Sequence, residues 1–384
     1  MDRILVFSGL VLAVSAAWAL HALDPSRRPD SIGARLSKEN NPAARTNAAT
    51  VFAQAVRADS ANAYLWEDLA EALAGAGRFD EARKASKRAT DLASGIPQIW
   101  FRDANLHFEN GENALALRSV KRIFEEVSDY DYVFFDYFDK LKLKPSDVLA
   151  EIEQNQRASR SYFEHLMAVN SVDGAQEAWR ALRPRGFIDQ RLSAMYIACL
   201  LRNHLYEAAR REWAASQQPS DYPDRNLVFN GDFERDFANC PLDWEIQPSE
   251  NVEITRDDSV AHDGRWSLKI HFQGNSNIAY ENITQTVVVH PGVHHLRAWV
   301  RTEAITSDQG IRLEIFDPAN PARFEMRTDT VTGSHDWTLI EASFTTAQFT
   351  NVIALRVIRT PSSMFYNAIN GTAWLDSVSL KEGS

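Results

Sequence analysis

His295-Leu-Arg-Ala-Trp-Val-Arg301 gives the clearest indication of the fold of the C-terminal half of the chain. Apolar and polar residues alternate along it with a period of two, which is typical of a β-strand between a core and solvent. The residues expected to point inward are Leu296, Ala298 and Val300, and those expected to point outward are Arg297, Trp299 and Arg301. The indole of Trp299 is therefore predicted to lie out of phase with the core of its own strand.

The same alternation recurs on both sides of this stretch. In residues 311–316 the outward set is predicted to be Arg312, Glu314 and Phe316, and residues 267–272 alternate in the same way. Further runs at 284–289, 337–345, 352–360 and 372–380 are separated by Gly, Asn, Asp and Pro. About eight to ten strands over roughly 160 residues are typical of one antiparallel β-sandwich. We expect this jelly-roll domain to occupy residues 224–384.

The middle of the chain contains an internal repeat with a 34-residue offset. This offset relates Trp66 to Trp100, and the same shift relates Gly77 to Gly111 and Ala82 to Ala116. The pattern resembles the tetratricopeptide repeat, which is a pair of amphipathic helices with this period. The resemblance predicts an α-helical solenoid over residues 47–218, clearest over 47–127. It implies a groove that binds a protein partner.

The N-terminal residues predict export from the cytoplasm. Ile4–Leu20 is uncharged and apolar, which fits either a signal peptide cleaved after Ala19 or a membrane anchor. We expect residues 1–22 to be this segment and residues 23–46 to be a Pro-containing linker. The remaining chain is then predicted to lie on the periplasmic side of a bacterial cell envelope, anchored to the inner membrane through residues 4–20 or secreted.

Composition excludes several classes of protein. The 41 basic and 52 acidic residues give a net charge of −11, which argues against a nucleic-acid binder. The two cysteines, Cys199 and Cys240, cannot form a disulfide framework or a four-cysteine zinc site, although a single bridge between them stays open. No phosphate loop, nucleophile elbow or metal triad occurs, so a non-catalytic protein is predicted. The least favoured alternative is a polysaccharide-acting enzyme that uses Glu314 and Glu341.

Serial motifs in the C-terminal half resemble a known family. Asn230-Gly-Asp-Phe-Glu234 opens the domain, Asp263-Gly-Arg-Trp-Ser-Leu268 follows, and Ala373-Trp-Leu-Asp-Ser-Val-Ser-Leu380 closes it. In order and spacing, these motifs resemble the galactose-binding-like jelly rolls of carbohydrate-binding modules, in the group that joins families 4, 9 and 22. The resemblance covers residues 226–381.

This resemblance implies a structural calcium ion. Such modules commonly tie the first strand to the last through one carboxylate from each, and the matching positions here are Glu234 and Asp376. Calcium takes six to eight oxygen ligands, so backbone carbonyls near Asp263 would have to complete the site. The alternative is that backbone amides alone cap the two carboxylates.

The resemblance also implies sugar binding on the concave sheet. Aromatic rings stack on sugar faces, and polar side chains bond the hydroxyl groups. The predicted stacking residues are Trp299 and Phe316. Tyr280, Phe365 and Tyr366 are expected in loops at the rim. The predicted polar contacts are Arg297, Arg301, Arg312 and Glu314.

Together these features predict a multidomain α + β protein with an N-terminal hydrophobic segment, a helical solenoid and a C-terminal antiparallel jelly roll. The function they favour is a non-catalytic envelope adaptor, with a protein partner in the solenoid and a polysaccharide or oligosaccharide on the jelly roll. Surface polysaccharide assembly or export would use such a pairing. The alternative is a structural assembly factor whose jelly roll contacts only protein.

Overall fold

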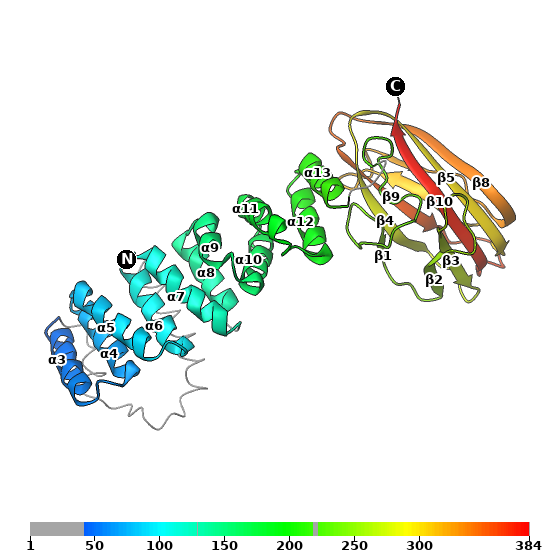
Figure 1. Ribbon diagram of the computed structural model, residues 1–384. Helices are drawn as coiled ribbons and strands as arrows, with labels where there is room; N and C mark the ends of the chain where they lie inside the picture. Colours follow the sequence, from blue (N-terminus) through cyan, green and yellow to red (C-terminus); the bar gives the residue numbers. More distant parts are fainter. Residues whose placement is uncertain (1–41, 129, 218–221, 384) are drawn as a thin grey trace. The chain divides into compact units, whose positions relative to one another are not determined.

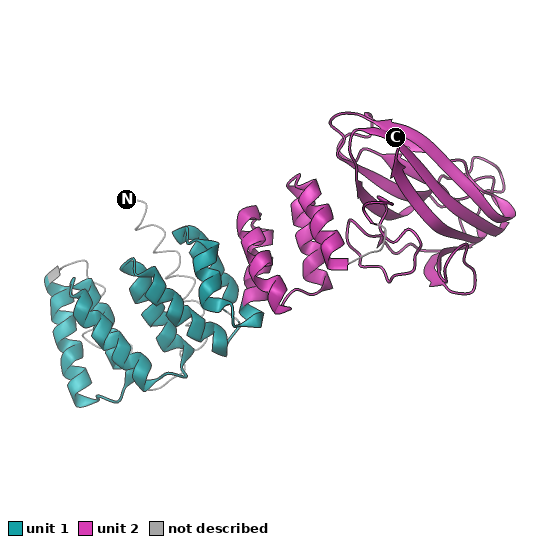
Figure 2. Ribbon diagram, turned by 45° about the horizontal axis from the view of Figure 1, so that its top comes forward, with its two compact units in different colours: residues 1–158 teal, residues 159–384 magenta. Residues whose placement is uncertain are grey.

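The computed structural model describes residues 42–128, 130–217 and 222–383. Within these residues, helices run from Pro42 to Gln217 and strands from Glu245 to Glu382, which confirms the predicted helical and β-sandwich parts (Figure 1). The chain divides into two compact units, Met1–Ala158 and Ser159–Ser384 (Figure 2). The second unit contains both the last helices and the whole sandwich.

The first unit is built from helical hairpins. Successive hairpins are α4 with α5, α6 with α7, and α8 with α9, preceded by α3. Their bounds are α3 Pro42–Ala58, α4 Ala63–Gly75, α5 Phe79–Leu92, α6 Pro97–Glu109, α7 Asn113–Glu126, α8 Asp131–Leu141 and α9 Pro145–Ile152, and α10 Gln156–Ala168 begins in this unit and ends in the next.

The 34-residue offset is visible as repeated local structure. The indole nitrogen of Trp66 donates to the Ser60 carbonyl at 3.0 Å, and that of Trp100 donates to the Ser94 carbonyl at 2.7 Å. The turns of the α4–α5 and α6–α7 hairpins are closed by glycines with positive φ, 76° at Gly77 and 73° at Gly111. Small residues make the close helix crossings, since each of these is 0% exposed: Ala70, Ala104, Ala82 and Ala116.

The same offset continues in the second unit. Its helices after α10 are α11 Val172–Leu182, α12 Gln190–Arg202 and α13 Tyr206–Gln217, with a short 3₁₀ turn, η1 Arg183–Arg185. Residues with left-handed backbone again close the turns, at Asn170 and His204. Buried pairs separated by 34 residues are Tyr162 and Tyr196, Leu166 and Leu200, Ala175 and Ala209, and Trp179 and Trp213.

The sandwich consists of two antiparallel five-stranded sheets. Sheet A has the strand order β1-β4-β9-β6-β7, and sheet B has the order β2-β3-β10-β5-β8. The strands are β1 Glu245–Ile246, β2 Val252–Asp257, β3 Ser267–Gln273, β4 Tyr280–Val288, β5 Gly292–Ile305, β6 Arg312–Phe316, β7 Glu325–Arg327, β8 Gly333–Thr346, β9 Val352–Arg359 and β10 Asn370–Glu382.

The inner faces of both sheets form one apolar core, as the alternation predicted. Leu296, Ala298 and Val300 of β5 are at most 1% exposed and meet Leu313 and Ile315 of β6 in this core. Burial of these side chains is the main driving force for closing the sandwich. The outer face of each sheet is therefore left to the intervening residues.

The last helix and the sandwich are joined by an aromatic contact. Trp213 of α13 is fully buried, and its ring meets Phe229 edge to face at 5.3 Å between centroids. Arg235, from the loop that opens the sandwich, donates to the Gln217 carbonyl at 3.2 Å. This bond satisfies a carbonyl at the C-terminal end of α13, where no helical partner exists.

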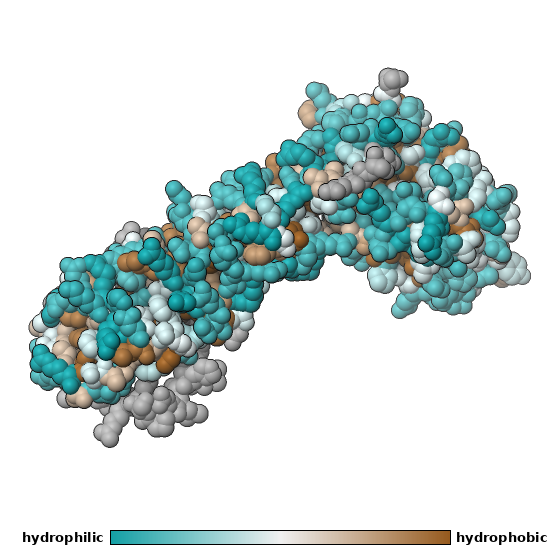
Figure 3. Space-filling view, in the orientation of Figure 1, coloured by the Kyte–Doolittle hydropathy of each residue, from teal (hydrophilic) through white to brown (hydrophobic). Residues whose placement is uncertain are grey.

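Polar residues cover most of the visible face of the helices and the sandwich (Figure 3). In the part of the chain that the structure describes, no helix has the length and apolar character needed to cross a membrane. The predicted signal or anchor segment at 4–20 lies outside the described residues. Cys199 and Cys240 are both free thiols and fully buried, so the structure contains no bridge between them.

Candidate functional site

The predicted sugar-binding residues are divided between two opposite faces of the sandwich. Arg297, Trp299 and Arg301 lie on the outer face of sheet B, in β5, and we name this surface the β5 face. The other three, in β6, lie on the outer face of sheet A, which we name the β6 face; they are Arg312, Glu314 and Phe316. A single site that uses all six residues is therefore wrong, because the apolar core separates the two sets.

On the β5 face, another ring already covers Trp299. The His262 imidazole stacks on the half-buried indole with 4.2 Å between centroids and 16° between planes. Trp337 meets the same imidazole edge to face at 5.5 Å. One face of the Trp299 ring is thus occupied by the protein, and a sugar could use that face only after His262 moved. The stacking role of Trp299 stays a prediction.

The rest of the β5 face is held by polar contacts. The Trp374 indole nitrogen donates to Asp257 at 2.8 Å, and the Arg301 guanidinium lies 5.9 Å from the centre of the Trp374 ring. Arg297 is exposed, and its Nε lies 3.7 Å from the Glu341 carboxylate, a loose surface pair of small energy. This arginine is the predicted β5 residue that is freest to contact a ligand.

On the β6 face, Glu314 is the centre of an ion cluster. Its carboxylate is 3% exposed and accepts from Arg327 at 2.8 Å and from Arg356 at 2.5 and 3.0 Å. Arg356 also covers the Phe316 ring, with its guanidinium carbon 4.5 Å from the ring centre. Both oxygens of Glu314 are bonded to these partly exposed arginines, so a sugar hydroxyl would have to compete with them. The role of Glu314 as a sugar contact stays a prediction.

The two carboxylates that the enzyme alternative requires do not lie together. Glu314 lies in β6 of sheet A, whereas Glu341 lies in β8 of sheet B. Both side chains point outward from opposite sides of the core, so they do not flank a common cleft as glycoside hydrolysis requires.

The prediction for Tyr280 is wrong. This tyrosine does not lie in a rim loop but is the first residue of β4, and it is 1% exposed within the core of the sandwich. Burial raises the pKa of its hydroxyl group, and that hydroxyl has no hydrogen-bond partner among the described residues. The side chain cannot reach a sugar. Phe365 and Tyr366, by contrast, lie in a loop and are 89% and 87% exposed.

The two carboxylates predicted to bind calcium instead accept hydrogen bonds from backbone amides. Asp376 is 0% exposed and accepts from the amides of His262 at 2.7 Å, Asp263 at 3.2 Å and Ser377 at 2.5 Å. Burial raises the pKa of Asp376, and the three amide bonds act in the opposite direction by stabilising its charge.

Glu234 is bound in the same manner. One of its oxygens accepts from the amides of Arg265 at 2.5 Å and Trp266 at 2.8 Å. A Cβ added to Gly264, where φ is +66°, would lie 2.4 Å from this oxygen, which explains the glycine in the Asp-Gly-Arg-Trp motif. Together the two carboxylates fix the loop at 262–266 against the sheet.

This donor set does not fit a calcium ion. N–H groups point at the oxygens that a cation would need, and a cation is repelled by the positive ends of such dipoles. Among the residues that the structure describes, no three or more His, Cys, Asp or Glu side chains are grouped so that they could hold a metal ion. Calcium binding by Glu234 and Asp376 stays a prediction without support from this geometry.

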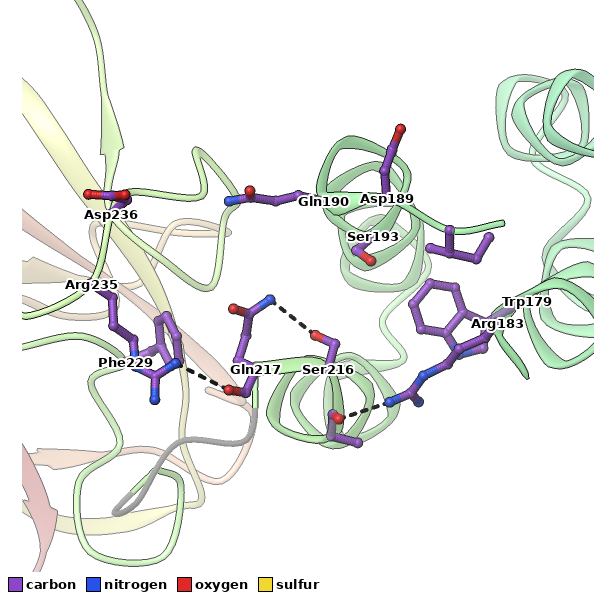
Figure 4. A pocket seen from close by; sticks show the side chains of 12 residues that line it. Trp179, Arg183, Asp189, Gln190, Ser193, Ser216, Gln217, Phe229, Arg235 and Asp236 are labelled. Carbon is purple, nitrogen blue, oxygen red and sulfur yellow. Dashed lines mark hydrogen bonds between the residues drawn. The ribbon is translucent and has the colours of Figure 1, made fainter. Parts of the chain in front are cut away.

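Two cavities lie in the second unit, next to α12, and neither contains a predicted site residue. One of about 520 Å³ lies between α11, α12, α13 and the loop that opens the sandwich (Figure 4). Two arginines at its edge bond the end of α13, with Arg183 donating to the Ala215 carbonyl at 2.9 Å and Arg235 to that of Gln217. The second, of about 720 Å³, is lined by α12 and the loop 237–245.

Comparison with known proteins assigns the C-terminal part. Residues 225–363 match the model of the carbohydrate binding domain family CBM_4_9. A search of curated proteins gives no match. One similar solved structure is a family 16 carbohydrate-binding module, with 18% identity and a TM-score of 0.30, covering 41% of this chain and 100% of the module.

Two further similar structures are also modules of this kind. TmCBM61 in complex with β-1,4-galactotriose is 17% identical, with a TM-score of 0.30, covering 42% of this chain and 100% of that chain. The CBM22-1 xylan-binding domain from Paenibacillus barcinonensis Xyn10C is 14% identical, with a TM-score of 0.26, covering 36% of this chain and 85% of that chain. By the family match, residues 225–363 of this chain are similar in sequence to the carbohydrate binding domain family CBM_4_9.

Proposed function

We propose that this protein is a non-catalytic adaptor of the bacterial cell envelope, whose jelly roll binds a glycan while its helical hairpins bind a protein partner. The observation that carries the proposal is the family match over residues 225–363. The β5 face offers an exposed arginine, Arg297, on the same strand as Trp299, whose indole is covered by His262 on one side. Arginine side chains and aromatic rings are groups that glycan recognition uses.

The protein-binding half of the proposal rests on the helical hairpins. We assign them to the tetratricopeptide class because the 34-residue offset recurs in buried residues of both units. Stacked hairpins of this kind present a continuous groove suited to an extended peptide or a partner helix. A role in surface polysaccharide assembly or export, on the periplasmic side, follows from the pairing of the two activities.

The test is glycan binding by the full chain. Titration with neutral and acidic polysaccharides in affinity electrophoresis should retard the wild-type protein. Arg297→Ala on the β5 face should weaken retardation, and Arg327→Ala on the β6 face should leave it unchanged. If both variants bind as the wild type does, the sheet faces are not the site; if the wild-type chain binds no glycan, the proposal fails.

A second candidate function is a structural assembly factor whose jelly roll contacts only protein. The observation that favours it is the coverage of Trp299 by His262 and of Phe316 by Arg356. Chemical cross-linking in membrane and periplasmic fractions distinguishes the two candidates. The adaptor should cross-link to a protein through its helices, whereas the assembly factor should also cross-link through both faces of the sandwich.

A further inference from the structure

Three loops meet at the end of the sandwich where β3, β5 and β9 finish. They are residues 274–279, 306–311 and 360–369, and we name this region the loop end. The Gly274 amide donates to the Ile369 carbonyl at 3.0 Å, and the Ile369 amide returns a bond to Ser276 at 3.1 Å. The Thr306 hydroxyl donates to the Ala368 carbonyl at 3.1 Å. The third loop is therefore bonded to both of its neighbours.

A buried arginine fixes these loops. Arg359 is 1% exposed, and its guanidinium donates hydrogen bonds to neutral oxygens of the three loops. Its guanidinium bonds Asn277, Ile278, Ser307, Gln309 and Asn367 at distances of 2.5 to 3.2 Å. Burying a guanidinium costs little free energy only when all five of its N–H groups donate hydrogen bonds. The loops must therefore keep the one arrangement that places their oxygens around Arg359.

On this fixed base, three large apolar side chains extend into solvent. Met364 is 60% exposed, Phe365 is 89% exposed and Tyr366 is 87% exposed. The two aromatic rings contact each other edge to face at 5.1 Å between centroids. The Met364 amide donates to the Ser362 hydroxyl at 3.0 Å, so the backbone that carries the rings is tied down as well. Neighbouring exposed apolar residues of this size commonly mark a contact surface.

The chemistry around the rings is neutral and rich in amides and hydroxyls. The three loops contain no Lys, Arg or His, and their one acidic residue is Asp308. Asparagines at 275, 277 and 367 and serines at 276, 362 and 363 make up much of the rest. Anionic lipid surfaces attract proteins through clustered Lys and Arg, which this end of the sandwich does not have.

We infer that the loop end is a glycan-contact site, in which Phe365 and Tyr366 stack on the faces of a neutral sugar. Amide and hydroxyl groups beside aromatic rings are the partners that sugar hydroxyls need, and both rings are open where those of the β5 and β6 faces are covered. The inference rests on the proposed glycan binding. It places the aromatic rings that contact the sugar at the loop end, not on the outer face of either sheet.

The experiment compares matched variants of the full chain on an array of neutral β-1,4-linked glucose, xylose, mannose and galactose tetramers. Phe365→Ala with Tyr366→Ala should weaken binding about tenfold or more, because loss of an aromatic anchor commonly costs above 1 kcal/mol. The control is Phe349→Ala, which removes a ring that is 78% exposed in the β8–β9 loop outside the loop end. An unchanged Tm shows that each variant is folded.

The outcomes separate the inference from the proposed function. If the wild-type chain binds a tetramer and the double variant binds it equally well, the loop end is not the glycan site. Glycan binding would then occur elsewhere on the sandwich. Absence of tetramer binding by the wild-type chain overturns the loop end as a site for neutral sugars, whereas the proposed function fails only if the titration with neutral and acidic polysaccharides is negative as well. If the wild-type chain floats with neutral phosphatidylcholine vesicles and the double variant does not, the two rings bind a membrane. That result would overturn the assignment of the rings to a sugar.

Discussion

Both regions of the molecule bury a carboxylate completely, but they satisfy it in different ways. Glu67 in the helical hairpins and Asp376 in the sandwich are each 0% exposed. Asp376 accepts hydrogen bonds from three backbone N–H groups. One oxygen of Glu67 bonds the Ser86 hydroxyl at 2.8 Å, and its other oxygen has no partner among the described residues. The comparison teaches that peptide amides can hold a charge inside a protein, whereas a lone hydroxyl favours a proton.

Counting hydrogens supports this reading of Glu67. The Ser86 oxygen lies 2.8 Å from Glu67 and 2.6 Å from Asp103, yet a hydroxyl has only one hydrogen to donate. One of the two carboxyl groups must therefore carry a proton. Asp103 also accepts from the Ser119 hydroxyl, whereas the second oxygen of Glu67 has no hydrogen-bond partner among the described residues, so we place the proton on Glu67. Burial raises the pKa of Glu67 to about 8, while the charge of Arg102 acts to lower it.

The largest expected effect is that of Asp376→Ala. Removing this carboxylate leaves three amides without their acceptor and frees the loop that places His262 on Trp299, which should cost about 4 kcal/mol of unfolding free energy. Urea unfolding measures the loss, and Trp299 fluorescence reports the freed loop. Asp336→Ala is the control, because the side chain of Asp336 is 87% exposed. Equal stability of the two variants would show that the amide contacts are not significant.

The second effect is the pH dependence that comes from Glu67. Its folded-state pKa of about 8 lies above the ordinary value of 4.5 for a glutamate, so the folded chain holds a proton that the unfolded chain releases between these values. Stability should therefore fall as the pH rises from about 5 to about 8, by a few kcal/mol at most.

Glu67→Gln tests this assignment. The amide side chain keeps the shape of the protonated acid and cannot ionise, so the variant should lose the part of the decline that comes from Glu67. The part that comes from Glu109, whose pKa burial raises to about 7, should remain. The exposed Glu126→Gln variant should keep the whole decline. An unchanged pH profile in Glu67→Gln would mean that another group causes the decline.

A smaller effect, about 2 kcal/mol, is expected for Gly264→Ala, from backbone strain together with the contact to Glu234. Gly333→Ala is a matched control, since Gly333 has a φ of +69° with no atom within 4 Å of an added Cβ. The difference in Tm between the two variants isolates the contact with Glu234. It should disappear when Glu234→Ala is added, and its persistence would locate the strain elsewhere.

The smallest effect concerns calcium. Since amides already bond Glu234 and Asp376, addition of EDTA to the purified chain should leave the Tm within about 1 °C, and added Ca²⁺ should not raise it. A rise in Tm that depends on the calcium concentration and is lost in Glu234→Gln would contradict this expectation. It would support the calcium site that the family resemblance implied.

Local patterns predicted the strands, the helical hairpins and, for most residues, whether the side chain points toward the core or toward solvent. The phase of β5 was correct because alternation is a property of one strand. Tyr280 was misplaced because the pairing of β4 with β9 shifts register between Tyr280 and Ile283, and such an irregularity reverses which side chains face inward. The 34-residue spacing between Trp179 and Trp213 is also a property of the sequence alone, and it extends the repeat signal beyond residue 127.

Contacts between distant residues could not be predicted from local patterns. The six predicted residues lie on two faces because β5 belongs to sheet B and β6 to sheet A. Which strand joins which sheet depends on pairing across the whole domain. His262 covers Trp299 because its amide bonds Asp376, which is 114 residues further along the chain. Arginines from β7 and β9 likewise bury Glu314.

The position of Trp213 has a consequence for how the protein can be divided. One repeat earlier, its counterpart Trp179 stacks on Tyr196 of the following hairpin at 4.5 Å, whereas Trp213 meets Phe229 of the sandwich. The sandwich therefore takes the place of the next hairpin and acts as the terminal cap that helical arrays require. Expressing the helices alone would uncover an indole, and grafting extra hairpins at this end would need a new surface to replace Phe229.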